Sequence, residues 1–504
     1  MGVGGDRGAL GRGLLLALLT PALVVVAFPP MGVWPAILVA FVPMLVAQHR
    51  VLPARWSGLG PAIAIGGMFG FHLSPGLVDG GLPVLAVLWP ILMGALVAPL
   101  FWRSRQFHEA TRYRWFLVSG PVAWVALDFL RSTANEVLAA TFGYPAYALW
   151  DHPVLLQPLS VVGINGLELL VLLVSWALAA AVLAAMDRRR SGDSVAPVLS
   201  ARRAGLGLAV VGGLVAVWIG SSLAMLEDPE PAVTVAAVQT GVDRDADDSS
   251  ERYRRDLAQT RRAAAAGAEL VVWNEKGLGF DPRPDGARGH TRPERTAELV
   301  ALVRETGVHL VIGFGFEDER GRHHNEVTLL TPEGEFLGVY GKDHPGTFAG
   351  DFSDTGGTYP VYDTDLGPIS TIICYDLDFT DTARHMARGG ARLVATPSAD
   401  VPSIAQIHFT HLVFRAIENR VSMVKADNEF DSAIIDPYGR VLRKAISSDG
   451  GRQATLVAEV PLGSGRSPWV SLGDWVGWAC SAGAVVLVVG AWRMRATSGS
   501  SRVG

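Results

Sequence analysis

Cysteine and charged residues are both scarce in this sequence. Only two of its 504 residues are cysteines, Cys374 and Cys480, which excludes the disulfide scaffolds of small secreted proteins. Charged side chains make up 18% of the chain, whereas ordinary soluble domains carry about 25%. The formal net charge of −5 provides no excess of positive charge for a polyanion. The sequence therefore predicts neither a disulfide-linked scaffold nor a nucleic-acid partner.

Apolar residues are abundant instead, and they are gathered into long runs. They make up 49% of the chain. Because a helix needs about 20 apolar residues to cross a bilayer core of roughly 30 Å, the runs predict a polytopic α-helical membrane domain with about eight spans. The third run is short and rich in glycine. The predicted spans are Leu14–Phe28, Val33–Ala47, Gly60–Phe71, Leu82–Trp102, Trp115–Phe129, Leu156–Met186, Leu206–Met225 and Val476–Trp492.

Basic residues predict how these spans are oriented. The loops Pro29–Gly32, His72–Gly81 and Ser132–Leu155 contain no lysine or arginine, whereas arginines flank the opposite ends of the spans. Under the positive-inside rule, both termini are cytoplasmic and the segment between the seventh and eighth spans lies outside the cytoplasm. The flanking arginines are Arg7, Arg12, Arg50, Arg55, Arg103, Arg105, Arg112, Arg114, Arg188, Arg189, Arg190, Arg202, Arg203, Arg493 and Arg495.

The segment before the last span has a different character. It is rich in charge, and strand-like runs such as "AELVVWNE" alternate with helical ones near Pro293–Thr306 and Ala405–Asn419. A hairpin is predicted across "EVTLLTPEGEFLGVYGK", so we expect a layered α/β domain. The expected domains are a membrane domain of residues 1–228, an extracytoplasmic α/β domain of residues 229–466, and a C-terminal span and tail of residues 467–504.

Three reactive side chains follow buried strands of this α/β domain. A thiol attacks a carbonyl only after it loses its proton, and a neighbouring carboxylate can accept that proton. An ammonium group lowers the pKa of the thiol and stabilises the oxyanion that forms. A carboxylate, an ammonium group and a thiol are therefore a complete set for acyl transfer through a thioester. The predicted strands are Leu270–Trp273, Phe336–Tyr340 and Ile369–Ile373, and the residues beyond them are Glu275, Lys342 and Cys374.

These residues also have ordinary structural explanations. A lone cysteine that closes a buried strand usually belongs to the core, a glutamate can cap the next turn, and a lysine is often solvated. Cys480 lies within the last predicted span, where packing explains it. His408 and His411 share a helix face without further ligands in the sequence, so we expect a packing or surface role rather than a metal site.

Several segments carry a resemblance to a known family. In chain order, "VVWNE", "GVYGKDH" and "STIICYD" resemble the three catalytic segments of the nitrilase superfamily. The segments "AFPPMGVWPAILVAFVPML", "PVAWVALDFLRS" and "FGYPAYALWDHPVLLQPLSVVGINGLELLVLLVSW" resemble apolipoprotein N-acyltransferases. The resemblance extends from about residue 14 to residue 490. It implies an αββα nitrilase-like sandwich inserted before the last span of a multi-pass protein in the bacterial inner membrane.

The resemblance also implies an activity and residue roles. Glu275 corresponds to the general base, Lys342 to the oxyanion stabiliser and Cys374 to the acylated nucleophile, with the backbone N–H of Tyr375 completing the oxyanion hole. The implied acyl donor is a phospholipid, and the implied acceptor is the α-amine of a diacylglyceryl-cysteine lipoprotein. Both substrates are held in membrane lipid. The reaction requires no metal, nucleotide or other cofactor.

The sequence departs from the family pattern near these residues. The usual Pro-Glu-Thr around the base is Asn-Glu-Lys, and Asp376 replaces the usual glutamate after the nucleophile. The segment between Lys342 and Cys374 is shorter than in the family and lacks its lid glutamate, for which Asp351 or Asp354 could substitute. These differences leave open a membrane-tethered amidase of the carbon-nitrogen hydrolase type, or a catalytically degenerate paralogue that binds lipoproteins.

Overall fold

The chain forms two compact units in this computed structural model. One comprises Met1–Leu149, Val162–Ser221 and Asp474–Gly504, and the other comprises Trp150–Val161 and Ser222–Gly473. Residues 135–142 of the predicted loop Ser132–Leu155 lie outside the described residues. The structure describes residues 3–134, 143–191, 199–242, 249–284, 291–347, 350–445 and 452–500.

The first unit is helical and apolar. Among the described residues, six stretches are long and apolar enough to cross a membrane, and they coincide with the first, second, third, fourth, sixth and seventh predicted spans. The fifth and eighth predicted spans coincide with α5 and α14, so the count of eight remains a prediction. The long helices are α1 (Val3–Ala27), α3 (Leu59–Asp79), α4 (Pro83–Ala110), α5 (Phe116–Ala134), α7 (Leu159–Ser191), α8 (Ala201–Met225) and α14 (Trp475–Ser500).

Two predicted spans differ from the structure in detail. The third is longer than predicted, because α3 continues to Asp79. Small residues permit close contact between α3 and α4: a Cβ on Gly94 of α4 would lie 2.5 Å from the carbonyl oxygen of Ala62 in α3. The second is not one α-helix but three short segments, and in two of them the second residue is a proline, which lacks an N–H donor. These segments are η1 (Trp34–Leu38), α2 (Val42–Val46) and η2 (Ala47–Val51).

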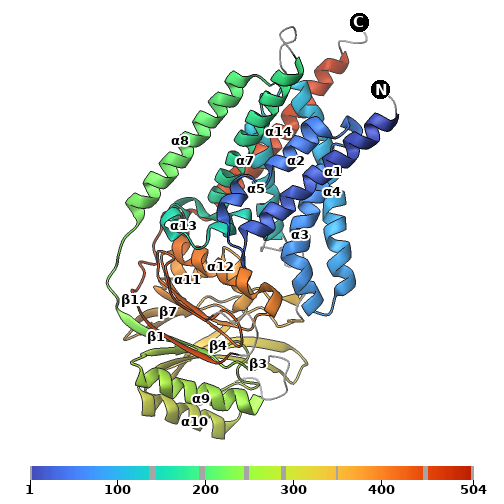
Figure 1. Ribbon diagram of the computed structural model, residues 1–504. Helices are drawn as coiled ribbons and strands as arrows, with labels where there is room; N and C mark the ends of the chain where they lie inside the picture. The colour runs from blue at the N-terminus through green and yellow to red at the C-terminus, as the bar shows by residue number, and fades with distance from the viewer. Residues whose placement is uncertain are drawn as a thin grey trace. The chain divides into compact units, whose positions relative to one another are not determined.

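The second unit contains two stacked six-stranded sheets with helices on both outer faces (Figure 1). This αββα sandwich is the predicted fold. The first sheet has the order β12-β1-β2-β3-β4-β5 and the second has the order β11-β10-β9-β8-β7-β6. The strands of the first sheet are β1 (Val233–Gln239), β2 (Leu270–Val272), β3 (His309–Glu317), β4 (His323–Leu330), β5 (Phe336–Gly341) and β12 (Ala454–Val460). Those of the second are β6 (Val361–Thr364), β7 (Gly367–Thr371), β8 (Leu393–Ser398), β9 (Ser422–Asp427), β10 (Ala433–Ile435) and β11 (Val441–Lys444).

Helices α9 and α10 lie on one outer face of the sandwich, and α11 and α12 lie on the other (Figure 1). The bounds of α10 agree with the predicted helix, which begins at a proline and ends at Gly307 in the left-handed conformation. The helices and short helical turns of this unit are η6 (Pro153–Leu155), α9 (Ser249–Ala265), α10 (Pro293–Thr306), η8 (Cys374–Asp378), α11 (Thr382–Arg388), α12 (Pro402–Asn419) and α13 (Pro468–Leu472). The first unit also contains two short helical turns, η3 (Ala54–Trp56) and η5 (Pro145–Leu149).

Parallel strands at the centre of each sheet determine where reactive residues emerge. β2 pairs in parallel with β1 and β3, and β8 pairs in parallel with β7 and β9. Their apolar residues are buried on both faces, as expected for parallel strands. The predicted β4–β5 hairpin is confirmed by its antiparallel register. The predicted strand ends are off by one or two residues: the strand before Cys374 ends at Thr371 rather than at Ile373. The strand before Glu275 ends at Val272 rather than at Trp273, and the strand before Lys342 ends at Gly341 rather than at Tyr340.

Candidate active site

Glu275 and Lys342 form a buried ion pair. Glu275 follows β2, Lys342 follows β5, and the Lys342 Nζ lies 2.8 Å from the Glu275 Oε1. The Lys342 backbone N–H donates to the Asn325 carbonyl oxygen at 2.9 Å, which continues the β4–β5 ladder by one residue. The hairpin register therefore determines where the lysine side chain leaves the sheet.

A second carboxylate completes this arrangement, which we call the first acid–lysine–acid cluster and which comprises Glu275, Lys342 and Asp351. The Lys342 Nζ lies 3.0 Å from the Asp351 Oδ2. The Asn325 side-chain amide donates to the Glu275 Oε1 at 2.6 Å and to the Asp351 Oδ2 at 2.9 Å. Of the two acids that could substitute for the lid glutamate, Asp351 is therefore the one that contacts the lysine. Asp354 is half-exposed and lies 3.4 Å from an arginine nitrogen of Arg322.

The charges of this cluster shift the pKa values of its members. Burial raises the pKa of Glu275, but the positive charges of Lys342 and Lys276 outweigh burial and hold the pKa below its ordinary value. Burial lowers the pKa of Lys342, but the negative charges of Glu275 and Asp351 raise it well above its ordinary value. At neutral pH, Glu275 is consequently an ionised carboxylate that can accept a proton.

Cys374 begins the tight turn η8 in a strained backbone conformation. Its φ of 44° lies in the left-handed region, which is rare for a residue other than glycine. The side chain is partly exposed, whereas Glu275 and Lys342 are buried. Strained backbone conformations of this kind are often found at functional sites.

Asp376 ties this turn to the segment that carries Lys342. Its Oδ2 accepts hydrogen bonds from the Ile373 backbone N–H at 2.8 Å and from the Tyr340 hydroxyl at 2.6 Å. Its Oδ1 accepts from the backbone N–H groups of Asp343 and His344 at 3.1 and 2.8 Å. Burial raises the pKa of Asp376 to about 6. One carboxylate thus connects the residue before Cys374 with the residues that flank Lys342.

The thiol of Cys374 is within electrostatic reach of the first cluster. Burial raises its pKa well above the ordinary value, the Glu275 charge raises it further, and the Lys342 charge opposes both. The thiol is therefore protonated at neutral pH, so that it needs a base to become a nucleophile. Tyr375 is buried with its ring edge-on to that of Phe379 at 5.1 Å, and the role of its N–H in an oxyanion hole remains a prediction.

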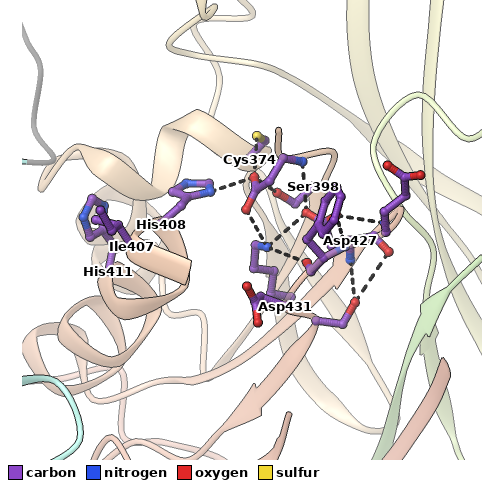
Figure 2. A network of polar contacts seen from close by, with 12 residues as sticks. Cys374, Ser398, Ile407, His408, His411, Asp427 and Asp431 are labelled. Atoms are coloured by element: carbon purple, nitrogen blue, oxygen red, sulfur yellow. Dashed lines mark hydrogen bonds and ion pairs between the residues drawn. The ribbon is translucent and has the colours of Figure 1, made fainter. Parts of the chain in front are cut away.

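The structure also places a second acid–lysine–acid cluster at Cys374, which comprises Asp400, Lys425 and Asp427. The Lys425 Nζ lies 2.9 Å from the Asp400 Oδ2 and 3.0 Å from the Asp427 Oδ2. The Cys374 thiol donates to the Asp400 Oδ1 at 3.6 Å. Figure 2 shows this network beside the sulfur. The sequence interpretation did not include these residues, although Asp400 follows a buried strand in the same way as Glu275.

His408 and His411 belong to this buried network rather than to the surface. The His408 Nδ1 lies 2.7 Å from the Asp400 Oδ1, and its Nε2 lies 3.4 Å from the Asp378 Oδ1. The His411 Nδ1 contacts the same Asp378 oxygen. A surface role is therefore wrong for both histidines. Within the described part of the chain, ligand atoms of Cys374, Asp400 and His408 lie within 4.8 Å of one another, but Lys425 already neutralises Asp400, and we assign no metal there.

Comparisons with known proteins match both parts of the chain. Residues 21–177 match the family model of the apolipoprotein N-acyltransferase N-terminal domain, and residues 234–467 match that of carbon-nitrogen hydrolases. An apolipoprotein N-acyltransferase of Geobacter metallireducens is 27% identical over 527 residues, which cover 96% of each protein. One of Agrobacterium fabrum is 24% identical and covers 77% of this chain and 82% of its own length.

Soluble relatives match the sandwich alone. An omega-amidase of Mus musculus is 27% identical over 236 residues, covering 42% of this chain and 84% of its own length. The crystal structure of an amidase from Nesterenkonia sp. is 23% identical with a TM-score of 0.39, and the match covers 48% of this chain and 94% of that one.

The sandwich, the reactive residues at its strand ends and the hydrolase match define a membrane protein of the nitrilase superfamily. The two matched segments follow one another in one chain, and full-length relatives share both. The chain belongs to the apolipoprotein N-acyltransferase family.

Proposed function

We propose that this protein transfers an acyl chain from a phospholipid to the N-terminal amine of a diacylglyceryl-cysteine lipoprotein through a thioester on Cys374. The observation that carries the proposal is the buried contact between Glu275 and Lys342, which Asp376 ties to the strained turn at Cys374. The N-acyltransferase relatives that span nearly the whole chain support the substrate class.

In the first half-reaction, Glu275 accepts the thiol proton while the sulfur attacks the ester carbonyl of the phospholipid. Lys342 stabilises the oxyanion, with the Tyr375 N–H as the second donor. The carbon–oxygen bond then breaks, and Glu275 returns the proton to the departing alcohol. Asp351 and Asn325 hold Lys342 and Glu275 in place. A lysophospholipid leaves, and the acyl chain remains on Cys374.

In the second half-reaction, the acceptor amine attacks the thioester, and an amide replaces it. An amide is more stable than the starting ester, so the reaction runs without an external energy source. Both substrates are anchored in a bilayer, which agrees with the apolar helices of the first unit. The flanking arginines favour cytoplasmic termini and an extracytoplasmic catalytic domain at residues 229–466, and the family supports a place in the bacterial inner membrane.

A membrane-tethered amidase is the second candidate, because the omega-amidases match the catalytic segment on its own. In that case water resolves the thioester. The test is to incubate purified protein with phospholipid and a diacylated peptide that has a free α-amine, and to identify the products by mass spectrometry. We expect a triacylated peptide from the wild type and none from Cys374→Ala. Free fatty acid without triacylated peptide would favour the hydrolase, and neither product would favour a binding paralogue.

A further inference from the structure

Two acid–lysine–acid clusters act on the Cys374 thiol, and the proposed acylation step uses only the first. The second contacts the sulfur through Asp400, which is itself almost fully buried. An enzyme that passes an acyl group from one substrate to another has two proton transfers to manage. One of them removes a proton from the thiol, and the other removes a proton from the acceptor amine.

The Asp400 Oδ1 gathers three donors at the site. They are the Cys374 thiol at 3.6 Å, the Ser398 hydroxyl at 2.9 Å and the His408 imidazole at 2.7 Å. Figure 2 shows the three side chains around this carboxylate. Acylation replaces the S–H hydrogen by a carbonyl carbon, so one of the three donors disappears. A position that can accept an N–H hydrogen bond is then left beside the thioester.

Fixed charges keep this carboxylate ionised. Burial raises the pKa of Asp400, but the positive charges of His408 and Lys425 outweigh burial and lower the pKa below its ordinary value. The backbone N–H of Asp400 donates to the Asp427 Oδ2 at 3.1 Å, which fixes the position of the residue. A buried carboxylate held in this way can accept a hydrogen bond, and then a proton, from an uncharged α-amine.

We propose that Asp400 binds the α-amine of the acceptor and relays its proton to the Cys374 sulfur. This inference rests on the proposed N-acyl transfer and assigns a catalytic residue to its second half. The amine nitrogen forms a bond to the thioester carbon, and the carbon–sulfur bond breaks. Asp400 takes the proton that the nitrogen loses and delivers it to the departing sulfur. The products are the amide and the free thiol, with the thiol–Asp400 hydrogen bond restored, so that atoms and charge balance without a further reactant.

The test separates the two half-reactions of the full-length enzyme in detergent. Acyl-enzyme is formed with phospholipid, quantified by intact mass, and then chased with the diacylated peptide or with hydroxylamine, an uncharged nucleophile. Asp400→Asn keeps Lys425 paired with Asp427. We expect this variant to form acyl-enzyme within about threefold of the wild-type rate, but to transfer it to the peptide amine about a hundredfold more slowly, the usual scale of a lost acid–base group. Release by hydroxylamine should be unchanged, which a general structural defect would not allow.

The matched control is Asp436→Asn, because Asp436 is a buried acid with its own arginine partner, Arg440, at 3.1 Å. It should leave all three rates unchanged. If Asp400→Asn does not fold, His408→Gln replaces the charged imidazole beside the same carboxylate by an uncharged amide, and it should slow peptide transfer about tenfold with hydroxylamine release unchanged.

Two results would overturn the inference: wild-type transfer to the peptide amine in Asp400→Asn, or a loss of acylation as complete as in Glu275→Gln. Wild-type transfer in His408→Gln would do the same if only that variant folds. Failure of the proposed function has a different signature, because the wild type itself would then form no acyl-enzyme or would pass it only to water.

Discussion

At the scale of single residues, Lys342 and Lys425 are both buried, and each lies between two carboxylates. Removing one partner from such a cluster has different consequences for different members. Without Glu275, Lys342 keeps the Asp351 contact at 3.0 Å. Without Lys342, the buried Glu275 loses its ion-pair partner and Asp351 keeps only the half-exposed Lys276 at 3.3 Å, which costs about 3–5 kcal/mol for a broken buried pair.

This asymmetry gives the first prediction. We expect Glu275→Gln to fold with a thermal midpoint close to that of the wild type, but to form acyl-enzyme about 10²–10⁴-fold more slowly for want of a base. Lys342→Met should lose acylation and also unfold at a clearly lower temperature. Both are measured by intact mass after incubation with phospholipid and by thermal unfolding in detergent. Full acylation in either variant would remove that residue from its role.

His344 provides a pH-dependent contact next to Lys342. Its ring stacks on Phe379 with 3.7 Å between centroids, and its Nε2 lies 3.3 Å from the Asp381 Oδ1. Burial lowers the pKa of His344, but the hydrogen bond and charge of Asp381 raise it to about 9. Because the folded pKa exceeds the unfolded value near 6.5, this stabilisation is complete below pH 6.5 and disappears as the pH rises through 9.

The second prediction follows from the direction in which this stabilisation changes with pH. Each pKa unit corresponds to about 1.4 kcal/mol, so the contact is worth about 3 kcal/mol at most. Wild type should therefore unfold at a higher temperature than His344→Gln at pH 6, and the two should converge by pH 10. The measurement is the thermal midpoint of both proteins across this range. A difference that grows with pH would contradict the assignment.

At the scale of elements, strand β3 allows Glu275 to approach because residue 313 is glycine. A Cβ on Gly313 would lie 2.3 Å from the Asn274 carbonyl oxygen and 3.1 Å from the Glu275 Cα. Backbone atoms at these distances must move, and a misplacement of about 1 Å can cost a hundredfold in rate. Gly313 therefore permits close packing behind the proposed base, Glu275.

Gly313→Ala is the third prediction. It should slow acyl-enzyme formation by about one to two orders of magnitude. Gly279→Ala, in the loop that follows Glu275, is the control, since a Cβ there meets no atom within 4 Å, and it should acylate normally. Equal rates in the two variants would show that the contact between β3 and the base has no catalytic consequence.

The elements that the sequence predicted best are those with strong local signals. The bounds of α10 and the β4–β5 hairpin follow from apolar spacing, a proline start and a Pro-Glu-Gly turn. Asn325 and Lys425 could not be predicted in this way. Both are polar residues within strands, and the alternation of apolar and polar residues along a strand does not indicate which other strand lies beside it. Only the pairing of β4 with β5 and of β9 with β8 brings them to the site. The second proposed span, with its prolines, likewise looked continuous in composition alone.

At the scale of the whole molecule, the number of spans before the sandwich decides which side of the membrane it occupies. Six stretches satisfy both length and hydropathy among the described residues, all of them before residue 228. The predicted arrangement adds α5 as a seventh, and its 19 residues are near the minimum length for a span. Six crossings would return the chain to the cytoplasm, whereas seven leave the sandwich outside.

A reporter fusion measures this directly, as the fourth prediction. Alkaline phosphatase fused after residue 228 should be active, because that enzyme requires export, and the same reporter fused after residue 110 should be inactive. Inactivity at both positions would show that α5 does not cross the membrane. The reverse pattern would show that the orientation is inverted, and either result would exclude the proposed topology.

The measurement that tests the central claim most directly is a peptide map of the acyl-enzyme. The purified protein is incubated with phospholipid that carries a labelled acyl chain, digested, and analysed by mass spectrometry before and after hydroxylamine treatment. The account predicts one acyl group on the peptide that contains Cys374, removed by hydroxylamine and absent from Cys374→Ala. Label on another residue, or none on Cys374 under conditions where the enzyme forms product, would contradict it.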